Sequence, residues 1–299
     1  MTRFPYDQFA KDYLKELLTP LGQVETSRDV AGEVREIDVW FTPLSTATSA
    51  AQALGLLGKF ATTPSIFEPF RNAVTSSQIR SCISKLFHVH ADLERQAKRE
   101  NTRINEADLT KLWILTPTAS PLLLETFKAM PDEENWLSGV YFLGEGFKTA
   151  IVAIHQLPRT TETLWLRILG KGTVQTQAIN ELTALPEDNP LRVNALELLY
   201  NLRVILEANQ NLEPEDRELI MELSPLYLER IDAALQSGMQ QGIQQGQRVV
   251  VENLLRIRFG ELDEELRGIV APLLELPPEE YTALLLQLSR DELLARLRK

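Results

Sequence analysis

The chain has 299 residues, 44% of them apolar, which is enough for two domains or for one large domain with an appendage. A single cysteine, Cys82, excludes a disulfide within the chain and suits a reducing compartment, and no apolar run is long enough to span a bilayer. The net charge of −11 argues against nucleic-acid binding along the whole chain. Together these features predict a soluble cytoplasmic protein that does not bind membranes.

The charge is unevenly distributed. Residues 1–116 carry 14 Lys and Arg and 14 Asp and Glu, so their balance is zero. The remainder carries 31 − 14 = 17 basic and 42 − 14 = 28 acidic residues, which accounts for the whole excess. We therefore expect any polyanion site in the N-terminal part and a scaffold or protein-binding role for the acidic half.

The first half of the chain alternates between helix and strand patterns. Helical spacing before Pro20 predicts an opening helix over 7–19, and a partly helical insertion is expected over 44–63. A long helix is expected over 76–100 and a shorter one over 121–130. Strands are expected at 23–30, 33–41, 65–68, 111–116, 139–143 and 149–155, with a turn at Ala31-Gly32. The segment 149–154 also fits a helix, because short apolar runs do not decide between the two.

From Thr161 onward the pattern is helical throughout. The expected helices cover 164–169, 174–185, 191–206, 215–235, 249–259, 262–274, 278–286 and 291–297. The sequence therefore predicts an α+β region over 1–156, a helical region over 157–236, and a Gly/Gln-rich segment with a small helical tail domain over 237–299. In short, the order is αβββαβ with a mixed sheet, followed by an all-helical C-terminal half.

Three glycines, Gly238, Gly242 and Gly246, repeat every four residues among glutamines. At helical spacing they form a row on one side, along which another helix can approach closely, most simply from a second copy of the chain. A flexible polar linker is the alternative, because each glycine costs a helix about 1 kcal/mol. The row predicts a homo-oligomer held by the C-terminal helices.

The strand over 33–41 carries an acidic residue between apolar ones. Ile37, Val39 and Phe41 alternate with Glu36, Asp38 and Trp40, as in a strand with one buried face. A carboxylate at the position of Asp38 is costly unless it is paired, hydrogen-bonded or bound to a metal. A strand with one solvated face is the alternative interpretation.

A second carboxylate, Glu68, ends the next expected strand. Two carboxylates on neighbouring strands can hold a divalent ion against a phosphodiester, where the ion polarises the phosphoryl oxygen and activates water. A nearby cation usually stabilises the developing charge. The basic end of the helix over 76–100, with Arg95, Lys98 and Arg99, could position a nucleic-acid backbone.

These features resemble the PD-(D/E)XK nuclease superfamily, and within it the Rpn-type bacterial proteins, the recombination-promoting nuclease and transposase group. The resemblance covers about residues 4–156. It rests on the αβββαβ order, on the segment REIDVWF at 35–41, and on the carboxylate near the end of the third strand. The segment VVENLLRIRFGEL at 250–262, after the Gly/Gln repeats, resembles a small helical domain of unknown function that often closes such chains.

The resemblance implies a restriction-endonuclease-like core and Mg²⁺- or Mn²⁺-dependent cleavage of DNA linked to recombination or mobile elements. It implies metal ligands at Asp38 and Glu68. The family has a lysine two residues after the glutamate, where this chain has Phe70, so Arg71 or Lys59 would have to supply the cation. The alternative is a catalytically degenerate nuclease fold that acts as a non-enzymatic, oligomeric interaction protein.

Overall fold

The computed structural model describes residues 5–29, 36–44, 48–209 and 212–297. They form two compact units, Met1–Ser224 and Pro225–Lys299. The expected order of helix, three strands, helix and strand is confirmed, and so is the helical character of residues 164–297. The turn expected at Ala31-Gly32 lies outside the described residues.

The first unit is built on a mixed sheet. Its strands are β1 Gly22–Asp29, β2 Glu36–Pro43, β3 Ser65–Pro69, β4 Lys111–Thr116, β5 Met130–Pro131, β6 Val140–Phe142 and β7 Thr149–Ala153. Their spatial order is β1-β2-β3-β4-β7-β6-β5. The pairs β3–β4 and β4–β7 are parallel and the other pairs are antiparallel. Every residue of β7 is buried, as suits an interior strand, and this decides the ambiguity over 149–154 in favour of a strand.

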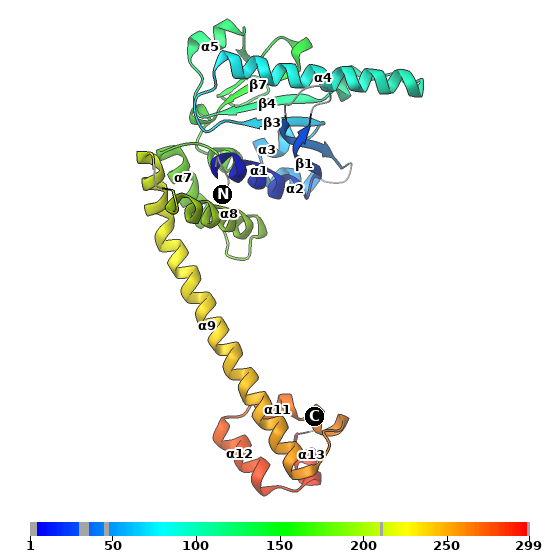
Figure 1. Ribbon diagram of the computed structural model, residues 1–299, viewed down its shortest axis with the longest axis vertical. Coiled ribbons are helices and arrows are strands. Elements are labelled where there is room, and N and C mark those ends of the chain that lie inside the picture. Colours follow the sequence, from blue (N-terminus) through cyan, green and yellow to red (C-terminus); the bar gives the residue numbers. More distant parts are fainter. Residues whose placement is uncertain (1–4, 30–35, 45–47, 210–211, 298–299) are drawn as a thin grey trace. The chain divides into compact units, whose positions relative to one another are not determined.

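Helices cover both faces of this sheet. Figure 1 shows α4, Ser76–Glu100, lying along one face and α1, Pro5–Leu18, on the other. Ile79, Cys82 and Leu86 of α4 pack into a cluster with Ile66 and Ile114 of the sheet. The remaining helices of the expected insertion and the following loops are α2 Thr48–Ala53, α3 Leu56–Phe60 and α5 Pro121–Thr126.

Local signals fix the ends of α4. Thr75 accepts a hydrogen bond from the Gln78 amide, and the Gln78 side chain accepts one from the Thr75 amide, which is a complete capping box. Asn101 ends the helix in the left-handed conformation that asparagine tolerates well. Because both ends are specified locally, the helix has the bounds that its periodicity predicts.

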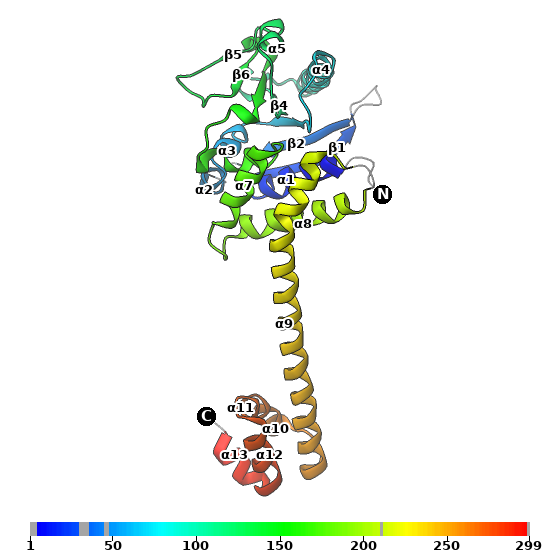
Figure 2. The same ribbon diagram turned by 90° about the vertical axis from the view of Figure 1, so that its left-hand side faces the viewer.

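The rest of the first unit is helical. Helices α6 Leu164–Arg167, α7 Thr173–Thr183 and α8 Pro190–Glu207 follow β7. Short 3-10 turns at Glu106–Asp108, Glu145–Phe147, Ile154–Gln156 and Thr161–Thr163 connect the elements. Figure 2 shows α8 crossing next to α1, so the sheet, α1 and α8 form successive layers. Sheet and helices therefore share one unit up to Ser224.

The glycine row lies within a helix. Helix α9, Pro214–Phe259, is 46 residues long and includes both the expected 215–235 and 249–259 helices, so the alternative of a flexible linker is wrong. In the second unit α10 Glu264–Gly268, α11 Val270–Leu274, α12 Pro278–Gln287 and α13 Arg290–Leu297 gather around the last turns of α9 (Figures 1 and 2). Val251, Leu255, Leu273 and Leu285 form their common core. No helix in the described parts of the chain is long and apolar enough to cross a membrane.

Candidate active site

Asp38 and Glu68 come together at one end of two neighbouring strands. In the antiparallel pairing of β2 with β3, Val39 lies opposite Phe67, so one further step along each strand brings Asp38 beside Glu68. The backbone amide of Asp38 donates a hydrogen bond to the Glu68 carboxylate. The two carboxylates that the sequence singles out are therefore neighbours, although 30 positions separate them in the numbering.

Each carboxylate has a lysine partner from a different helix. Lys85 of α4 donates to both oxygens of Glu68, at 2.9 Å to Oε1 and 2.7 Å to Oε2. Lys11 of α1 lies 3.0 Å from Asp38 Oδ1 and 3.0 Å from Asp7 Oδ2. Both lysine side chains are largely buried, and Glu68 is only 2% exposed. The two strands and the helices on both faces of the sheet thus contribute to one charged cluster, which we call the carboxylate site.

The electrostatics of the carboxylate site follow from burial and from like charge. Burial, and then the neighbouring charge of Asp38, raise the pKa of Glu68 to about 7, against the opposing effect of Lys85. Burial also raises the pKa of Asp38, although Lys11 opposes the shift. Burial lowers the pKa of Lys11, but the charge of Asp38 and the bonds to Asp7 outweigh it, so that pKa is raised. The site favours an additional positive charge, because its two acids are costly to ionise together.

An open cavity of about 500 Å³ adjoins the carboxylate site. Asp7, Lys11 and Asp38 line it on one side, and Phe70 and Arg71 are also part of its wall. Glu68 is not among the lining residues. A ligand in the cavity would therefore meet the Asp38 carboxylate and the Lys11 ammonium first, and Glu68 is buried next to Asp38.

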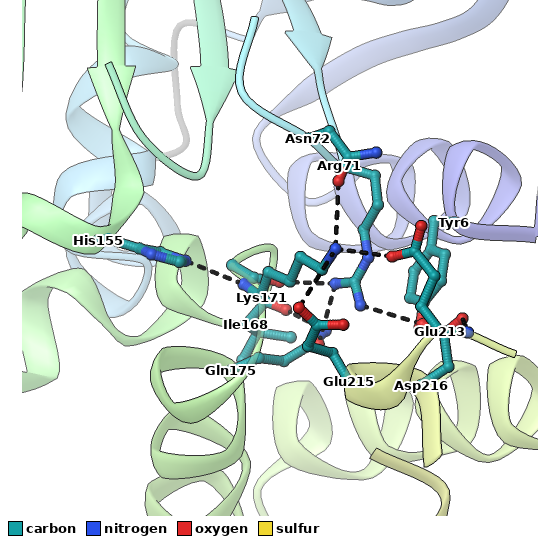
Figure 3. Close-up of polar contacts among 11 residues, drawn as sticks. Tyr6, Arg71, Asn72, His155, Ile168, Lys171, Gln175, Glu213, Glu215 and Asp216 are labelled. Atoms are coloured by element: carbon teal, nitrogen blue, oxygen red, sulfur yellow. Dashed lines mark hydrogen bonds and ion pairs between the residues drawn. The ribbon is translucent and has the colours of Figure 1, made fainter. Parts of the chain in front are cut away.

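Arg71, which the sequence offers as the missing cation, is engaged elsewhere (Figure 3). Its Nη1 donates to the carbonyl of Gly170 at 3.1 Å and to Gln175 Oε1 at 3.2 Å, and its Nη2 lies 3.4 Å from Asp216 Oδ1. The guanidinium carbon sits 3.7 Å from the centre of the Tyr6 ring. Arg71 thus fastens the loop after β3 to α1, α7 and the start of α9, an arrangement that we call the arginine clasp.

A second cation extends the arginine clasp. Lys171 Nζ lies 2.7 Å from Glu213 Oε2 and donates to Asn72 Oδ1 at 3.2 Å (Figure 3). The Lys171 amide donates to His155 Nε2 at 3.2 Å. Burial, and then the charge of Arg71, lower the pKa of His155, which keeps its ring neutral and able to accept this bond.

Lys59 lies away from the carboxylates. Its Nζ donates to the Asn135 carbonyl and sits 4.1 Å from the centre of the Trp136 ring. Phe70, at the position where the resemblance expects lysine, packs against the core below α4 and lines the cavity. At the basic end of α4, Arg95 pairs with Asp92 on the helix surface. Neither Lys59 nor this helix end contributes to the charged cluster around Asp38.

Sequence reasoning missed Lys85 and Lys11. Lys85 lies three residues after Cys82 and one before Leu86, so it lies next to the buried residues of α4. Lys11 stands among the buried residues of α1, four positions after Asp7. A lysine on a buried stripe requires a carboxylate partner. That signal was available in the sequence, but it does not say which carboxylate is the partner.

The donor set of the carboxylate site suits a hard divalent cation. Mg²⁺ is commonly bound by one or two carboxylates and keeps several waters. Asp38 and Glu68 offer that number, and burial, followed by the neighbouring charge of Asp38, raises the pKa of Glu68. Among the described residues, no group of three or more His, Cys, Asp or Glu could hold a metal ion.

Comparison with known proteins adds no relative. The chain matches no family model, no curated protein and no solved structure. Function is therefore inferred from the geometry of the carboxylate site and its cavity.

Proposed function

We propose that the chain is a metal-dependent endonuclease-like protein that hydrolyses phosphodiester bonds in DNA. The observation that carries this proposal is the meeting of Asp38 and Glu68 on adjacent strands, each with a lysine, beside an open cavity. Two carboxylates, with waters and phosphate oxygens, make a suitable environment for Mg²⁺ or Mn²⁺. An association with recombination or mobile elements is proposed only from the resemblance of residues 4–156 to the Rpn-type proteins.

Each side chain of the carboxylate site has its own role in the proposed reaction. Asp38 and Glu68 would hold the metal, which when bound polarises the phosphoryl oxygen and lowers the pKa of water. Lys85 favours the ionised form of Glu68 and fixes the direction of its carboxylate through two hydrogen bonds. Lys11 borders the cavity beside Asp38, where its ammonium can contact a phosphate oxygen.

The test is a plasmid-nicking assay with the purified full chain in Mg²⁺ or Mn²⁺, repeated in EDTA. Metal-dependent nicking that is lost in Asp38→Asn and in Glu68→Gln would support the proposal. Asp92→Asn is a matched control, because Asp92 is an exposed carboxylate on α4. Nicking that survives in both site variants would point to a contaminating nuclease and contradict the assignment.

One observation favours a second candidate function. Glu68 is nearly fully buried, and Lys85 already bonds both of its oxygens, so the ammonium can take the place of a metal in a folded but inactive protein. We propose as this alternative a catalytically degenerate nuclease fold that serves as a non-enzymatic, oligomeric interaction protein. Titration calorimetry with Mg²⁺ and Mn²⁺ separates the two. Binding that is lost in Asp38→Asn supports the enzyme, and no binding at millimolar metal supports the degenerate fold.

A further inference from the structure

Helix α9 carries a line of exposed apolar side chains through the second unit. Leu228, Leu235, Met239, Ile243, Val250 and Ile257 are all exposed, with 68% of Met239 and 80% of Ile257 accessible to solvent. Their separations of four and seven residues keep them on one side of a helix with 3.6 residues per turn. We call this set, together with Gly242 and Gly246 between its members, the apolar stripe. It extends over roughly 45 Å at 1.5 Å per residue.

The apolar stripe is distinct from the side of α9 that holds the tail domain. Val251 and Leu255 point into the core shared with α10–α13, whereas Val250 and Ile257 remain exposed. A Cβ added at Gly238, Gly242 or Gly246 would meet nothing within 4 Å among the described residues. The second unit therefore does not use the stripe for its own packing. An exposed apolar row of this length on a helix is characteristic of an interaction surface.

We propose that the apolar stripe pairs with the same stripe of a second copy of this chain, with the two helices antiparallel. In this arrangement the second helix is turned end for end about the point between Gly242 and Ile243. Each large side chain then faces a partner that fits it. The facing pairs are Leu228 with Ile257, Leu235 with Val250, Met239 with Gly246, and Ile243 with Gly242 of the second copy.

Size complementarity explains the glycines. Met239 and Ile243 are the large side chains of the glycine-rich stretch, and in the antiparallel arrangement both lie against glycine. The absence of a Cβ lets a backbone approach closely, which accounts for glycine at positions where it costs a helix about 1 kcal/mol each. In a parallel, in-register pair Met239 would face Met239 and Gly246 would face Gly246, so crowded and empty layers would alternate.

Charge complementarity points to the same orientation. Asp232 and Asn253, both exposed, occupy the same side of α9 as the apolar stripe. An antiparallel pair brings the Asp232 carboxylate opposite the Asn253 amide, which can donate a hydrogen bond to it. A parallel pair brings two Asp232 carboxylates together, which is repulsive. Antiparallel alignment also sets the positive end of each helix dipole beside the negative end of the other.

The first measurement is the mass of the full-length protein in solution, by light scattering after size-exclusion chromatography. We expect twice the chain mass of 33.9 kDa at micromolar concentration, and the single-chain mass for the double variant Met239→Asp with Ile243→Asp. Gly246→Leu should raise the dimer dissociation constant by about tenfold or more, because the new side chain would occupy the space that Met239 of the second copy needs. Gly238→Leu is the matched control, since Gly238 lies about a quarter turn from the stripe and the change in helix propensity is the same.

The second measurement tests orientation by disulfide formation in a Cys82→Ala background. Leu235→Cys and Val250→Cys chains are prepared separately and then mixed under oxidation. The antiparallel pair predicts a cross-linked dimer in the mixture and little in either sample alone. Both positions are exposed, so circular dichroism should report unchanged folding. A monomeric parent at micromolar concentration overturns the proposal, and so does a dimer in which Leu235→Cys cross-links efficiently with itself.

Discussion

Two groups of buried charge lie on either side of Pro69, the carboxylate site around Glu68 and the arginine clasp around Arg71. They begin three residues apart in the chain, but they use their charges differently. In the clasp, one guanidinium is shared by a carbonyl, an amide and a carboxylate from distant segments. In the carboxylate site, two acids are held so close that burial and like charge raise the pKa of Glu68 to about 7.

The difference teaches that a charged residue close in sequence to a site residue need not belong to the same site. The clasp balances Arg71 against Asp216 and joins distant segments, so removing either partner would leave the other charge buried and unpaired. Residues of both groups line the same cavity, but only the carboxylate site holds two acids whose pKa values are raised, which is a common mark of a functional site. In the proposed function, Asp38 and Glu68 with Lys85 and Lys11 would therefore carry the chemistry, and Arg71 would have a structural role.

The largest effect should come from Asp38→Ala. If Asp38 is a metal ligand, as proposed, its removal should lower the nicking rate by more than the roughly 10- to 100-fold typical of partners outside the ligand shell. Nicking is measured with Mg²⁺ on supercoiled plasmid, beside Asp92→Ala as the control carboxylate. If the Asp38→Ala protein cleaves at the parental rate, the carboxylate site has no catalytic role, and it does not differ from the arginine clasp in function.

Arg71→Ala should act on stability. Because it leaves the largely buried Asp216 without its cation, we expect the free energy of unfolding to fall by about 3 kcal/mol. Urea denaturation measures this, with the exposed Arg80 as the control, where Arg80→Ala should change the free energy by less than about 0.5 kcal/mol. If Arg71→Ala is as stable as the parent but does not cleave DNA, Arg71 contributes to catalysis and its role is not only structural.

Lys85→Met should destabilise the protein in a pH-dependent way. Without the Lys85 ammonium, an ionised Glu68 is buried with one partner fewer, which we expect to cost about 2 kcal/mol at about pH 8. At about pH 5 Glu68 is mostly protonated in the folded state, so the cost should be smaller there. Unfolding curves at both pH values, with Lys85→Arg as the charge-retaining control, measure the difference. If the mutation lowers the free energy of unfolding equally at both pH values, Lys85 does not influence the ionisation of Glu68.

The carboxylate site should also make the free energy of unfolding of the metal-free parent depend on pH. The pKa of Glu68 is about 7 in the folded state, above its usual value of 4.5. The folded protein therefore binds more protons between these values, and the stability contributed by protonated Glu68 is lost as the pH rises through that window. Denaturation in EDTA across the window should show a decline that is flatter in Glu68→Gln. A steeper decline in the variant would contradict the assignment.

The smallest effect is expected for Phe70→Lys. The position is where the resemblance expects a lysine, but the Lys85 ammonium already contacts both Glu68 oxygens. A second ammonium should therefore change the nicking rate by less than about tenfold, or 1.4 kcal/mol in the barrier. A much larger gain would mean that Lys85 does not substitute for the family's lysine, and that the site is a weakened version of the family's.

Much of the fold was predictable because it depends on local patterns. The capping box at Thr75 and Gln78, the left-handed Asn101 and the apolar spacing between them determine α4 within the sequence itself. The continuous apolar run at Lys111–Thr116 indicates an interior strand before any partner is known. The alternation in β2 and the end of β3 also identified Asp38 and Glu68 as the carboxylates of interest.

Tertiary structure decided which charges meet. Arg71 pairs with Asp216, 145 residues later, and Lys85 reaches Glu68 from a helix that crosses the sheet. Neither pairing has a local signature, because a side chain of either kind can extend several ångströms in any direction that its element allows. The sequence by itself determined the helices, the strands and the two acids. The packing of α4 and α1 on opposite faces of the sheet decided which cations complete the site, because only packing sets distances between residues that are far apart in the chain.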